Sequence, residues 1–248
     1  MPGCPLKISI VTVSYNSAAT IEQTIESVLD QDYENFEYII IDGGSNDGTV
    51  DIIEKYSDRL AYYVSEPDNG LYDAMNKGIS RTTGDIVGMI NSDDYYFQNA
   101  FQTVANAYIG HNIEEYIFWG DVMYEVQGRV AGFRPENRTI GAFAPHPSMF
   151  CPKCVYERIG LYDTSFRLLA DYDFMYRAVN KYLIKPLYEP ELIAFFREGG
   201  LADKNILPCL KDELRVKLKY GQNPIYARII FLLKVIKNIS RIWKGSRQ

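Results

Sequence analysis

The stretch LKISIVTVSYN, from Leu6 to Asn16, decides the fold of this chain. After Lys7 it contains no charged residue, and five of the nine residues that follow are β-branched. A run of this kind is typical of a strand that is buried on both faces of a parallel sheet. The polar end of the run, from Ser14 onward, should then lie at the carboxyl edge of that sheet, where ligands bind in such folds.

Outward from this strand, strand and helix patterns alternate along the chain. The segment TIEQ at residues 20–23 has the form of a capping box before an apolar helical repeat. The alternation predicts an α/β fold, in which a mostly parallel sheet carries helices on both faces. The expected strands cover residues 36–42, 60–65, 85–90, 116–122 and 129–133, and the expected helices cover residues 21–29, 51–53, 71–79, 98–109 and 171–182.

The composition is that of a globular protein whose two ends differ in charge. The 248 residues include 47% hydrophobic side chains, and no segment is long enough to span a bilayer. Residues 1–5 lead directly into the first strand without a signal-peptide pattern, so we expect a cytoplasmic protein. From residue 204 to the end there are eleven Lys and Arg and two acidic residues, which give a formal net charge of +9. Residues 1–203 have a formal net charge of −15. An acidic body with a basic tail suggests two separate roles.

Two of the four cysteines, Cys151 and Cys154, have the spacing of half a zinc site or of a redox pair. The sequence offers no second Cys/His pair to complete such a site, because His111 and His146 are far apart. Two ordinary reduced thiols are therefore the favoured interpretation.

Three polar clusters follow expected strand ends, at residues 14–17, 42–47 and 91–94. The third ends in the adjacent acids Asp93 and Asp94. These acids could cap the following helix, where exposed N–H groups favour negative charge. They could also hold Mg²⁺ or Mn²⁺, which proteins bind with one or two carboxylates plus substrate phosphates.

Two further segments surround these acids in the expected fold. The glycine-rich loop DGGSNDGT at residues 42–49 lacks both the lysine of a phosphate-binding P-loop and the G-x-G-x-x-G of a dinucleotide site. The segment SEPDNGLYDAMNKGI at residues 65–79 combines a turn with a polar helix, on which Asp73 and Lys77 have the spacing of a surface salt bridge. Such a bridge does not explain why so polar a helix directly follows a strand end.

Taken in order, these segments resemble family 2 of the inverting bacterial glycosyltransferases with the GT-A fold, of the type that builds O-antigen and exopolysaccharide repeat units. The resemblance covers residues 7–94 closely and returns at residues 144–177. It implies a Rossmann-like GT-A domain at residues 1–203, with a nucleotide-sugar half at about 1–97 and an acceptor half at about 98–203. A basic amphipathic helical tail at residues 204–248 would follow.

The resemblance also implies roles for single residues. Asp94 corresponds to the acid that binds Mn²⁺ or Mg²⁺, His146 to a possible contact with the metal or the diphosphate, and Asp171 to the catalytic base. Without the resemblance, Asp171 would be a helix cap and His146 a structural histidine, and Asp173 is a weaker alternative base. The expected nucleotide-sugar contacts are Val13, Tyr15, Asp42, Gly43, Asp73, Asn76, Lys77, Ser92 and Asp93. The segment FREGGLA at residues 196–202 would close over the diphosphate.

One departure from the family pattern concerns the donor base. Many relatives carry two acids before Gly-Ser in the second-strand loop, and the second acid contacts uracil. This chain has Gly43 after Asp42, so the resemblance leaves both UDP-sugars and GDP-sugars open as donors.

The expected reaction is an inverting, metal-dependent transfer of a sugar from a nucleotide-sugar donor to a glycan or a polyprenyl-diphosphate-linked acceptor. A sugar nucleotidyltransferase is the second enzyme class, but VTVSYNSAAT lacks the glycine-rich loop with Arg and Lys of that class. A non-catalytic nucleotide-sugar-binding or scaffold protein of the same fold is the remaining alternative.

The tail contains Lys234, Lys237, Arg241 and Lys244, which would form one stripe on a continuous helix. With Trp243 and many Ile and Leu residues, such a helix can lie in an anionic membrane interface on the inner face of the cell membrane, or pack on the domain. Nucleic acid is not an expected partner, because the body is acidic and carries no recognition motif.

Overall fold

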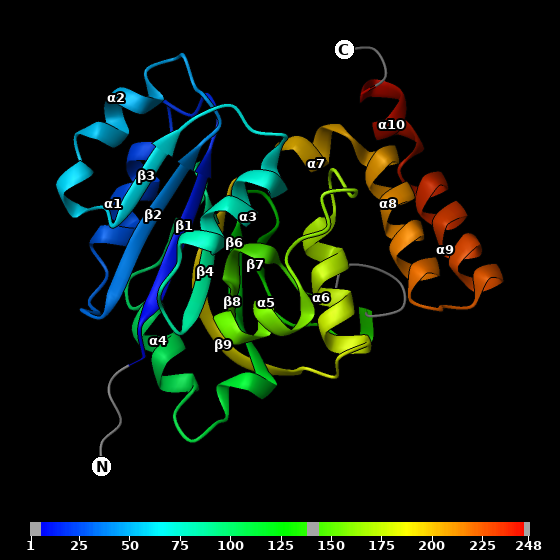
Figure 1. Ribbon diagram of the computed structural model, residues 1–248. Coiled ribbons are helices and arrows are strands. Elements are labelled where there is room, and N and C mark those ends of the chain that lie inside the picture. The colour runs from blue at the N-terminus through cyan, green and yellow to red at the C-terminus, as the bar shows by residue number, and fades with distance from the viewer. Residues whose placement is uncertain (1–5, 138–143, 246–248) are drawn as a thin grey trace.

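The first strand lies inside a twisted sheet, with neighbours on both sides, in the computed structural model, which describes residues 6–137 and 144–245 (Figure 1). Strand β1 (Ile8–Ser14) is buried along its whole length and pairs in parallel with β2 (Phe36–Asp42) on one side and β4 (Ile86–Asn91) on the other. Strand β3 (Tyr62–Ser65) adds in parallel beyond β2. The pairing confirms the expected buried parallel strand and brings the three strand ends to one edge.

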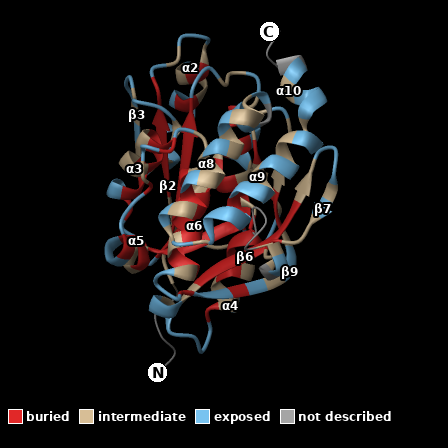
Figure 2. Ribbon diagram, turned by 90° about the vertical axis from the view of Figure 1, so that its right-hand side faces the viewer, coloured by how far each residue is buried: buried red, intermediate tan, exposed pale blue. Residues whose placement is uncertain are grey.

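Side chains of the central strands alternate between two hydrophobic cores, as a period of two requires. One core contains Ile8, Ile10, Tyr38 and Ile40, and the other contains Val11, Val13, Ile39 and Ile41. The first core is covered by α1 (Ile21–Leu29), α2 (Thr49–Glu54) and α4 (Ala100–Ala107). The second is covered by α3 (Leu71–Arg81), α5 (Lys153–Ile159) and α6 (Ala170–Asn180). Figure 2 shows the buried residues concentrated in the sheet between these layers, which confirms the α/β fold with helices on both faces.

The second half of the chain extends the same sheet with strands of mixed direction. Strand β8 (Met149–Pro152) runs antiparallel to β4 and joins it to β6 (Tyr116–Tyr124), which pairs in parallel with β9 (Lys185–Phe196). The short strands β5 (Tyr95–Tyr96) and β7 (Gly128–Val130) pair with β9 and β6. Short 3-10 turns lie at Ser57–Arg59, Ile113–Glu115, Pro135–Asn137 and His146–Ser148.

Two local expectations are wrong. Thr20 precedes α1 but makes no capping bond with its side chain, because its hydroxyl donates to the Ser17 carbonyl at 3.4 Å instead. The strand expected at residues 129–133 ends at Val130. A Cβ atom on Gly132 would lie 1.8 Å from the Gly120 carbonyl oxygen, so the chain crosses the neighbouring backbone here rather than continuing the ladder.

The tail is helical, as expected, but it is not one helix. It consists of α7 (Leu201–Lys204), α8 (Ile206–Lys219), α9 (Pro224–Lys237) and α10 (Ile239–Gly245), and the expected domain boundary at 203/204 falls inside α7. The expected single basic stripe is wrong, because α9 ends at Lys237 and Lys234 points inward to Glu213 at 2.7 Å. Within the described ranges, no helix combines the length and apolar character needed to cross a bilayer.

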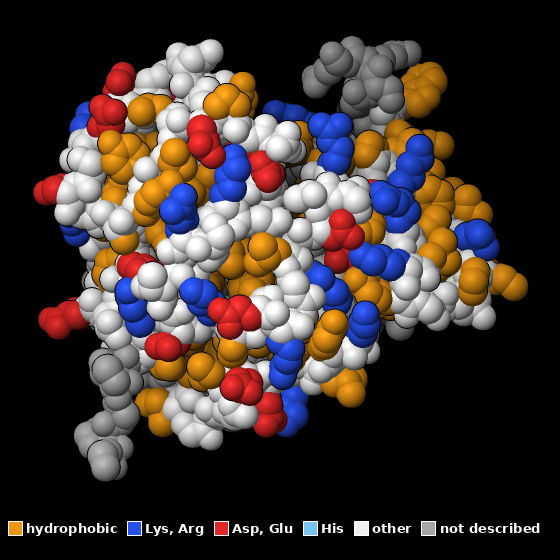
Figure 3. Space-filling model, in the orientation of Figure 1, with side chains coloured by type: hydrophobic (Ala, Val, Ile, Leu, Met, Phe, Trp, Pro, Cys, Tyr) orange, Lys and Arg blue, Asp and Glu red, His pale blue; other side chains and the backbone are white. Residues whose placement is uncertain are grey.

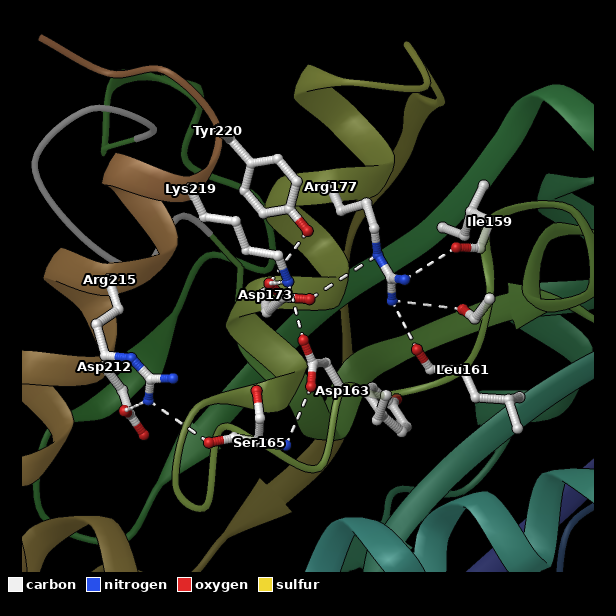
Figure 4. Close-up of polar contacts among 12 residues, drawn as sticks. Ile159, Leu161, Asp163, Ser165, Asp173, Arg177, Asp212, Arg215, Lys219 and Tyr220 are labelled. Atoms are coloured by element: carbon white, nitrogen blue, oxygen red, sulfur yellow. Dashed lines mark hydrogen bonds and ion pairs between the residues drawn. The ribbon is translucent and has the colours of Figure 1, made fainter.

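A buried ionic network fastens α8 to α6 (Figure 4). Asp173, which is fully buried, accepts hydrogen bonds from Lys219 Nζ at 2.9 Å and from the Tyr220 hydroxyl at 3.1 Å. Lys219 also pairs with Asp163 at 2.9 Å, and Arg177 Nε lies 3.8 Å from Asp173. Asp173 is therefore committed to holding the tail on the domain, which argues against its weaker assignment as a catalytic base.

We expect Asp173→Asn to lower the free energy of unfolding by about 1.5–3 kcal/mol, because it removes the charge of a buried carboxylate that accepts two hydrogen bonds. Urea unfolding of the full chain measures this change. Asp212→Asn is the matched control: it breaks the Arg215–Asp212 pair, in which Arg215 is largely exposed, and should cost less than about 1 kcal/mol. Equal small losses in both variants would show that the network does not hold the tail.

Candidate functional site

The three polar clusters predicted from the sequence do meet at the carboxyl edge of the sheet. The Ser14 hydroxyl donates to Asp42 Oδ1 at 2.8 Å, which joins the first cluster to the second. The hydroxyls of Ser17 and Ser92 lie 2.7 Å apart, which joins the first to the third. Because three loops far apart in sequence share these bonds, the edge forms one continuous polar surface.

Asp42 organises the glycine-rich loop. Its carboxylate is fully buried and accepts hydrogen bonds from the hydroxyls of Ser14, Ser45 and Ser65 and from the N–H groups of Gly44 and Ser45. Burial alone would raise the pKa of Asp42, but the bonds from Ser45, Ser65 and Ser14 hold it below its ordinary value. Asp42 is therefore an ionised anchor for the loop, and its expected contact with a donor base stays a prediction.

The backbone of Gly43 lies close to the carboxylate of Asp68 and to the ring of Tyr15. A Cβ atom at this position would lie 2.6 Å from Asp68 Oδ2 and 3.3 Å from the ring of Tyr15. Asp68 thus places a carboxylate next to the position that holds a second acid in many relatives. The Tyr15 ring is largely exposed at the end of β1, so it offers an aromatic face to a planar ligand.

The adjacent acids follow β4 and differ in their surroundings. Asp94 is only 1% exposed and accepts a hydrogen bond from the Arg197 backbone N–H at 2.9 Å and a longer one from the Asn91 side chain at 3.3 Å. Burial raises the pKa of Asp94 well above its ordinary value, the charge of Asp93 raises it further, and the Arg197 and Asn91 bonds offset this only in part. Burial also raises the pKa of Asp93, against the charge of Arg197. The acid pair therefore lacks a full counter-charge in the described structure.

The residues around the acid pair fit a hard divalent cation. Asn91 Oδ1 is buried and has no hydrogen-bond partner among the described residues, so an unused oxygen acceptor lies beside the two carboxylates. Oxygen ligands of this kind suit Mg²⁺ and Mn²⁺, which complete their coordination with water and substrate phosphate. Within the described residues no cluster of three or more His, Cys, Asp or Glu side chains is placed to hold a metal. A cation here would thus depend on the bound substrate for part of its coordination.

Helix α3 carries three of the predicted contacts, and all three side chains have protein partners. Asp73 accepts a hydrogen bond from the Asn69 backbone N–H at 3.0 Å, and the predicted pair with Lys77 is present at 3.7 Å. Lys77 lies nearer to Glu66, at 2.9 Å. The amide of Asn76 donates to the Tyr162 carbonyl at 2.9 Å and accepts from the Tyr162 N–H at 3.0 Å, so it joins α3 to the segment between α5 and α6. Donor contacts from these residues stay predictions.

Asp171 lies in the first turn of α6 and faces α3. The Tyr72 hydroxyl donates to Asp171 Oδ1 at 2.7 Å and also lies 3.0 Å from the Leu168 carbonyl oxygen. Burial, together with the charge of Asp171, raises the pKa of Tyr72 well above its ordinary value, so the hydroxyl remains a donor. Asp171 is half-buried, and Tyr72 orients its carboxylate between α3 and α6.

His146 lies deeper on the same side. It is buried, and its Nε2 atom is 3.5 Å from the Tyr162 hydroxyl. Burial lowers the pKa of His146, and the charge of Asp171 opposes that shift. The imidazole therefore lies within the electrostatic reach of Asp171, and its role as a metal ligand stays a prediction.

The cysteine pair is divided between two elements. Cys151 is buried in β8 and Cys154 is half-buried in α5, and both are free thiols. Burial raises the pKa of each thiol, so both are protonated in the way expected of ordinary reduced cysteines.

Two residues have contacts that the sequence did not predict. Tyr72 belongs to a helix noted only for its polar residues, and its position in the first turn of that helix gives a buried hydroxyl donor. The segment at residues 196–202 was expected to close over the diphosphate with backbone N–H groups or with Arg197; in the structure the Arg197 N–H binds Asp94 and its guanidinium donates to Gln23 at 3.3 Å. The segment from Phe196 onward thus touches the acid pair directly.

The buried charge of Asp94 predicts a pH-dependent stability in the absence of metal. The folded chain holds the Asp94 proton more tightly than the unfolded chain, so the free energy of unfolding should fall as the pH rises above the ordinary carboxyl pKa of about 4. In EDTA at neutral pH, Asp94→Asn should therefore raise the melting temperature by about 2–4 °C, equivalent to roughly 1 kcal/mol. The exposed Asp58→Asn is the control and should leave it unchanged. A lower melting temperature for Asp94→Asn would contradict the electrostatic argument.

Comparison with known proteins agrees with this geometry. Residues 9–157 match the family described as Glycosyl transferase family 2. An uncharacterized glycosyltransferase of Mycobacterium tuberculosis is 34% identical over 182 residues, which cover 69% of this chain and 68% of the relative.

Solved structures share the fold at low sequence identity. Residues 1–349 of Staphylococcus aureus TarS, in complex with UDP, align with a TM-score of 0.67 at 17% identity, covering 95% of this chain and 72% of that one. The mannosyltransferase PcManGT of Pyrobaculum calidifontis, in complex with GDP-Man and Mn²⁺, also aligns with a TM-score of 0.67 at 17% identity, covering 98% and 72%. On the match of more than half of its length to the family, this chain belongs to glycosyl transferase family 2.

Proposed function

We propose that this chain is a metal-dependent, inverting glycosyltransferase that moves a hexosyl or deoxyhexosyl group from a UDP- or GDP-sugar to an acceptor hydroxyl. The observation that carries the proposal is the acid pair that follows β4, in which Asp94 is buried and Asp93 is partly buried. Structures of the same fold bind UDP in one case and GDP-Man with Mn²⁺ in another, which supports a nucleotide-sugar donor and a divalent ion. Surface polysaccharide synthesis, on a glycan or a polyprenyl-diphosphate-linked acceptor at the inner face of the membrane, is the proposed setting.

The donor would lie across the carboxyl edge of the sheet. Tyr15 presents its exposed ring where the base would stack, and Gly43 leaves room for the backbone to approach that base. A divalent ion held by Asp93 and Asp94 would offset the charge of the departing diphosphate. The backbone N–H of Arg197 fixes the Asp94 carboxylate in place for that task.

The transfer itself requires a base on the acceptor side. Asp171 would accept the proton of the acceptor hydroxyl while the acceptor oxygen forms a bond to the anomeric carbon. The bond from that carbon to the diphosphate oxygen breaks in the same step, and the nucleoside diphosphate leaves with the electron pair. Because attack and departure occur on opposite faces, the configuration at the sugar inverts without a covalent enzyme intermediate. Tyr72 would keep the Asp171 carboxylate turned toward the acceptor.

Calorimetric titration with UDP, GDP and a panel of nucleotide sugars, with Mn²⁺ and with EDTA, tests the donor site. We expect one nucleotide class to bind, and to bind at least about tenfold more tightly with Mn²⁺, because two carboxylates otherwise repel a diphosphate. Asp94→Asn should abolish the Mn²⁺ effect, whereas Asp58→Asn should not. No binding of any nucleotide by the folded wild-type chain would refute the proposal.

Asp171→Asn should separate binding from chemistry. With the donor identified by calorimetry, release of nucleoside diphosphate to water or acceptor should fall by about 10²–10⁴-fold, the usual contribution of a general base. Donor affinity should stay within about twofold, because Asp171 lies on the acceptor side. Asp212→Asn, which changes an acidic residue of the tail helix α8, is the control and should alter neither turnover nor donor affinity. Donor binding without turnover in the wild-type chain would favour the non-catalytic binding protein instead.

A further inference from the structure

The outward side of α9 is apolar. The exposed side chains Ile225, Ile229, Leu232, Leu233 and Ile236 follow one another at steps of three, four and one residues, which places them on one face of a helix. Between 49% and 71% of each side chain is exposed. We call this set the apolar face of α9. Figure 3 shows hydrophobic side chains gathered along the outer edge of the molecule that α9 forms.

The inward side of α9 packs on the domain through apolar residues and one ion pair. Ala227 is buried there, and Lys234 binds both carboxylate oxygens of Glu213 at 2.7 Å. Glu213 also accepts from Lys217, which is itself buried on α8. Because the inward side already packs on α8, the apolar face points away from the domain and has no cover within the described chain.

Cations flank the apolar face. Successive residues of an α-helix are rotated by about 100° about its axis. On this basis the exposed residues Arg228 and Lys237 lie about 90° to either side of the centre of the apolar face. The apolar character continues into α10, where Ile239 and Trp243 are also exposed. The helix therefore presents a hydrophobic strip between two positively charged borders. When such a strip is buried, the long basic side chains can remain at a polar boundary.

The charge of the tail identifies what covers this strip. From residue 214 to the end, the sequence contains nine Lys and Arg and no Asp or Glu. A second copy of the chain, docked face to face, would bring the borders of equal charge together with no acid to pair them. A bilayer with anionic lipids offers phosphate groups to the borders and acyl chains to the strip.

We propose that α9 and α10 bind the surface of an anionic lipid bilayer. The apolar face of α9 and Trp243 enter the boundary between headgroups and acyl chains, while Arg228 and Lys237 remain at the depth of the phosphates. The helices lie along the surface and do not cross it. This binding depends on the tail alone and is independent of which donor the domain uses.

The two tryptophans give the experiment a local probe. Trp119 is fully buried in the core, whereas Trp243 is 67% exposed on α10. On addition of vesicles made of equal parts phosphatidylglycerol and phosphatidylcholine, we expect the emission of the full chain to shift to shorter wavelength and the chain to co-sediment with the vesicles. Trp243→Phe should remove the shift and retain most of the co-sedimentation. Pure phosphatidylcholine vesicles, or raised salt, should bind the chain much less because the cations then lose their partners.

Substitutions on the strip test whether its aliphatic side chains enter the bilayer. Leu232→Ser with Ile236→Ser should weaken vesicle binding by about 10²-fold, since each buried aliphatic side chain is worth roughly tenfold. Ile109→Ser with Val126→Ser is the matched control, because those two side chains are also largely exposed but lie on the body. Both pairs lie on the surface, so unfolding curves and nucleotide titrations should match the wild-type chain.

Three results would overturn the proposal. One is unchanged vesicle binding by the Leu232→Ser/Ile236→Ser variant. Another is equal binding to neutral and anionic vesicles, which would remove the role of the charged borders. The third is a dimer in sedimentation velocity that the same variant dissociates, with no vesicle binding by the wild-type chain, since a second copy would then cover the strip. Loss of nucleotide binding would bear only on the transferase proposal.

Discussion

A buried carboxylate without a full counter-charge governs the centre of this molecule. Asp94 is almost inaccessible to water, and its two protein partners are the neutral N–H groups of Arg197 and Asn91. A helix-capping acid does not need such a position, because N–H groups at an exposed helix end satisfy a carboxylate in contact with water. Burial next to Asp93 therefore carries an unfavourable electrostatic free energy, which the divalent cation of the proposed function would relieve. Hydrogen bonds of Asp42 and the serines near it join the three loops of the surrounding sheet edge, and the Arg197 N–H holds the Asp94 carboxylate in its buried position.

The same rigidity extends between the two halves of the domain. Asn76 on α3 holds both backbone groups of Tyr162, and Tyr72 on the same helix holds Asp171 on α6. A single helix thus fixes the position of the segment that carries Asp171. In the proposed displacement this matters, because the base, the attacking oxygen and the departing oxygen would have to be closely aligned. Asn76 and Tyr72 of α3 make this connection, whereas Asp73 and Lys77 bond to Asn69 and Glu66 near the start of the same helix.

The sequence predicted what depends on local periodicity and missed what depends on tertiary packing. The buried strands β1, β2 and β4 and the meeting of their polar ends follow from hydrophobic pattern and parallel topology alone. The cap at Thr20 failed because a turn at Ser17 competes for its hydroxyl, and residues 131–133 left the ladder because Gly132 crosses Gly120. The hydrogen bond from Tyr72 to Asp171 joins residues 99 positions apart, which no spacing rule reveals. The tail was assigned as helical and basic correctly, but its inward side depends on Glu213, a residue of another helix.

That inward side also indicates that the tail does more than cover the domain. The side of α9 that faces the domain carries the buried Ala227 and the partly buried Ile230 and Phe231, together with Lys234, which shares Glu213 with Lys217 of α8. Packing on the domain is therefore served by these residues, and yet five further large aliphatic side chains face outward. A helix that only covered the domain would carry polar side chains on that outward side, so the outward side fits a surrounding other than water. Because the flanking charges are all positive, the medium that replaces water must be apolar within and negative at its boundary, as an anionic bilayer is.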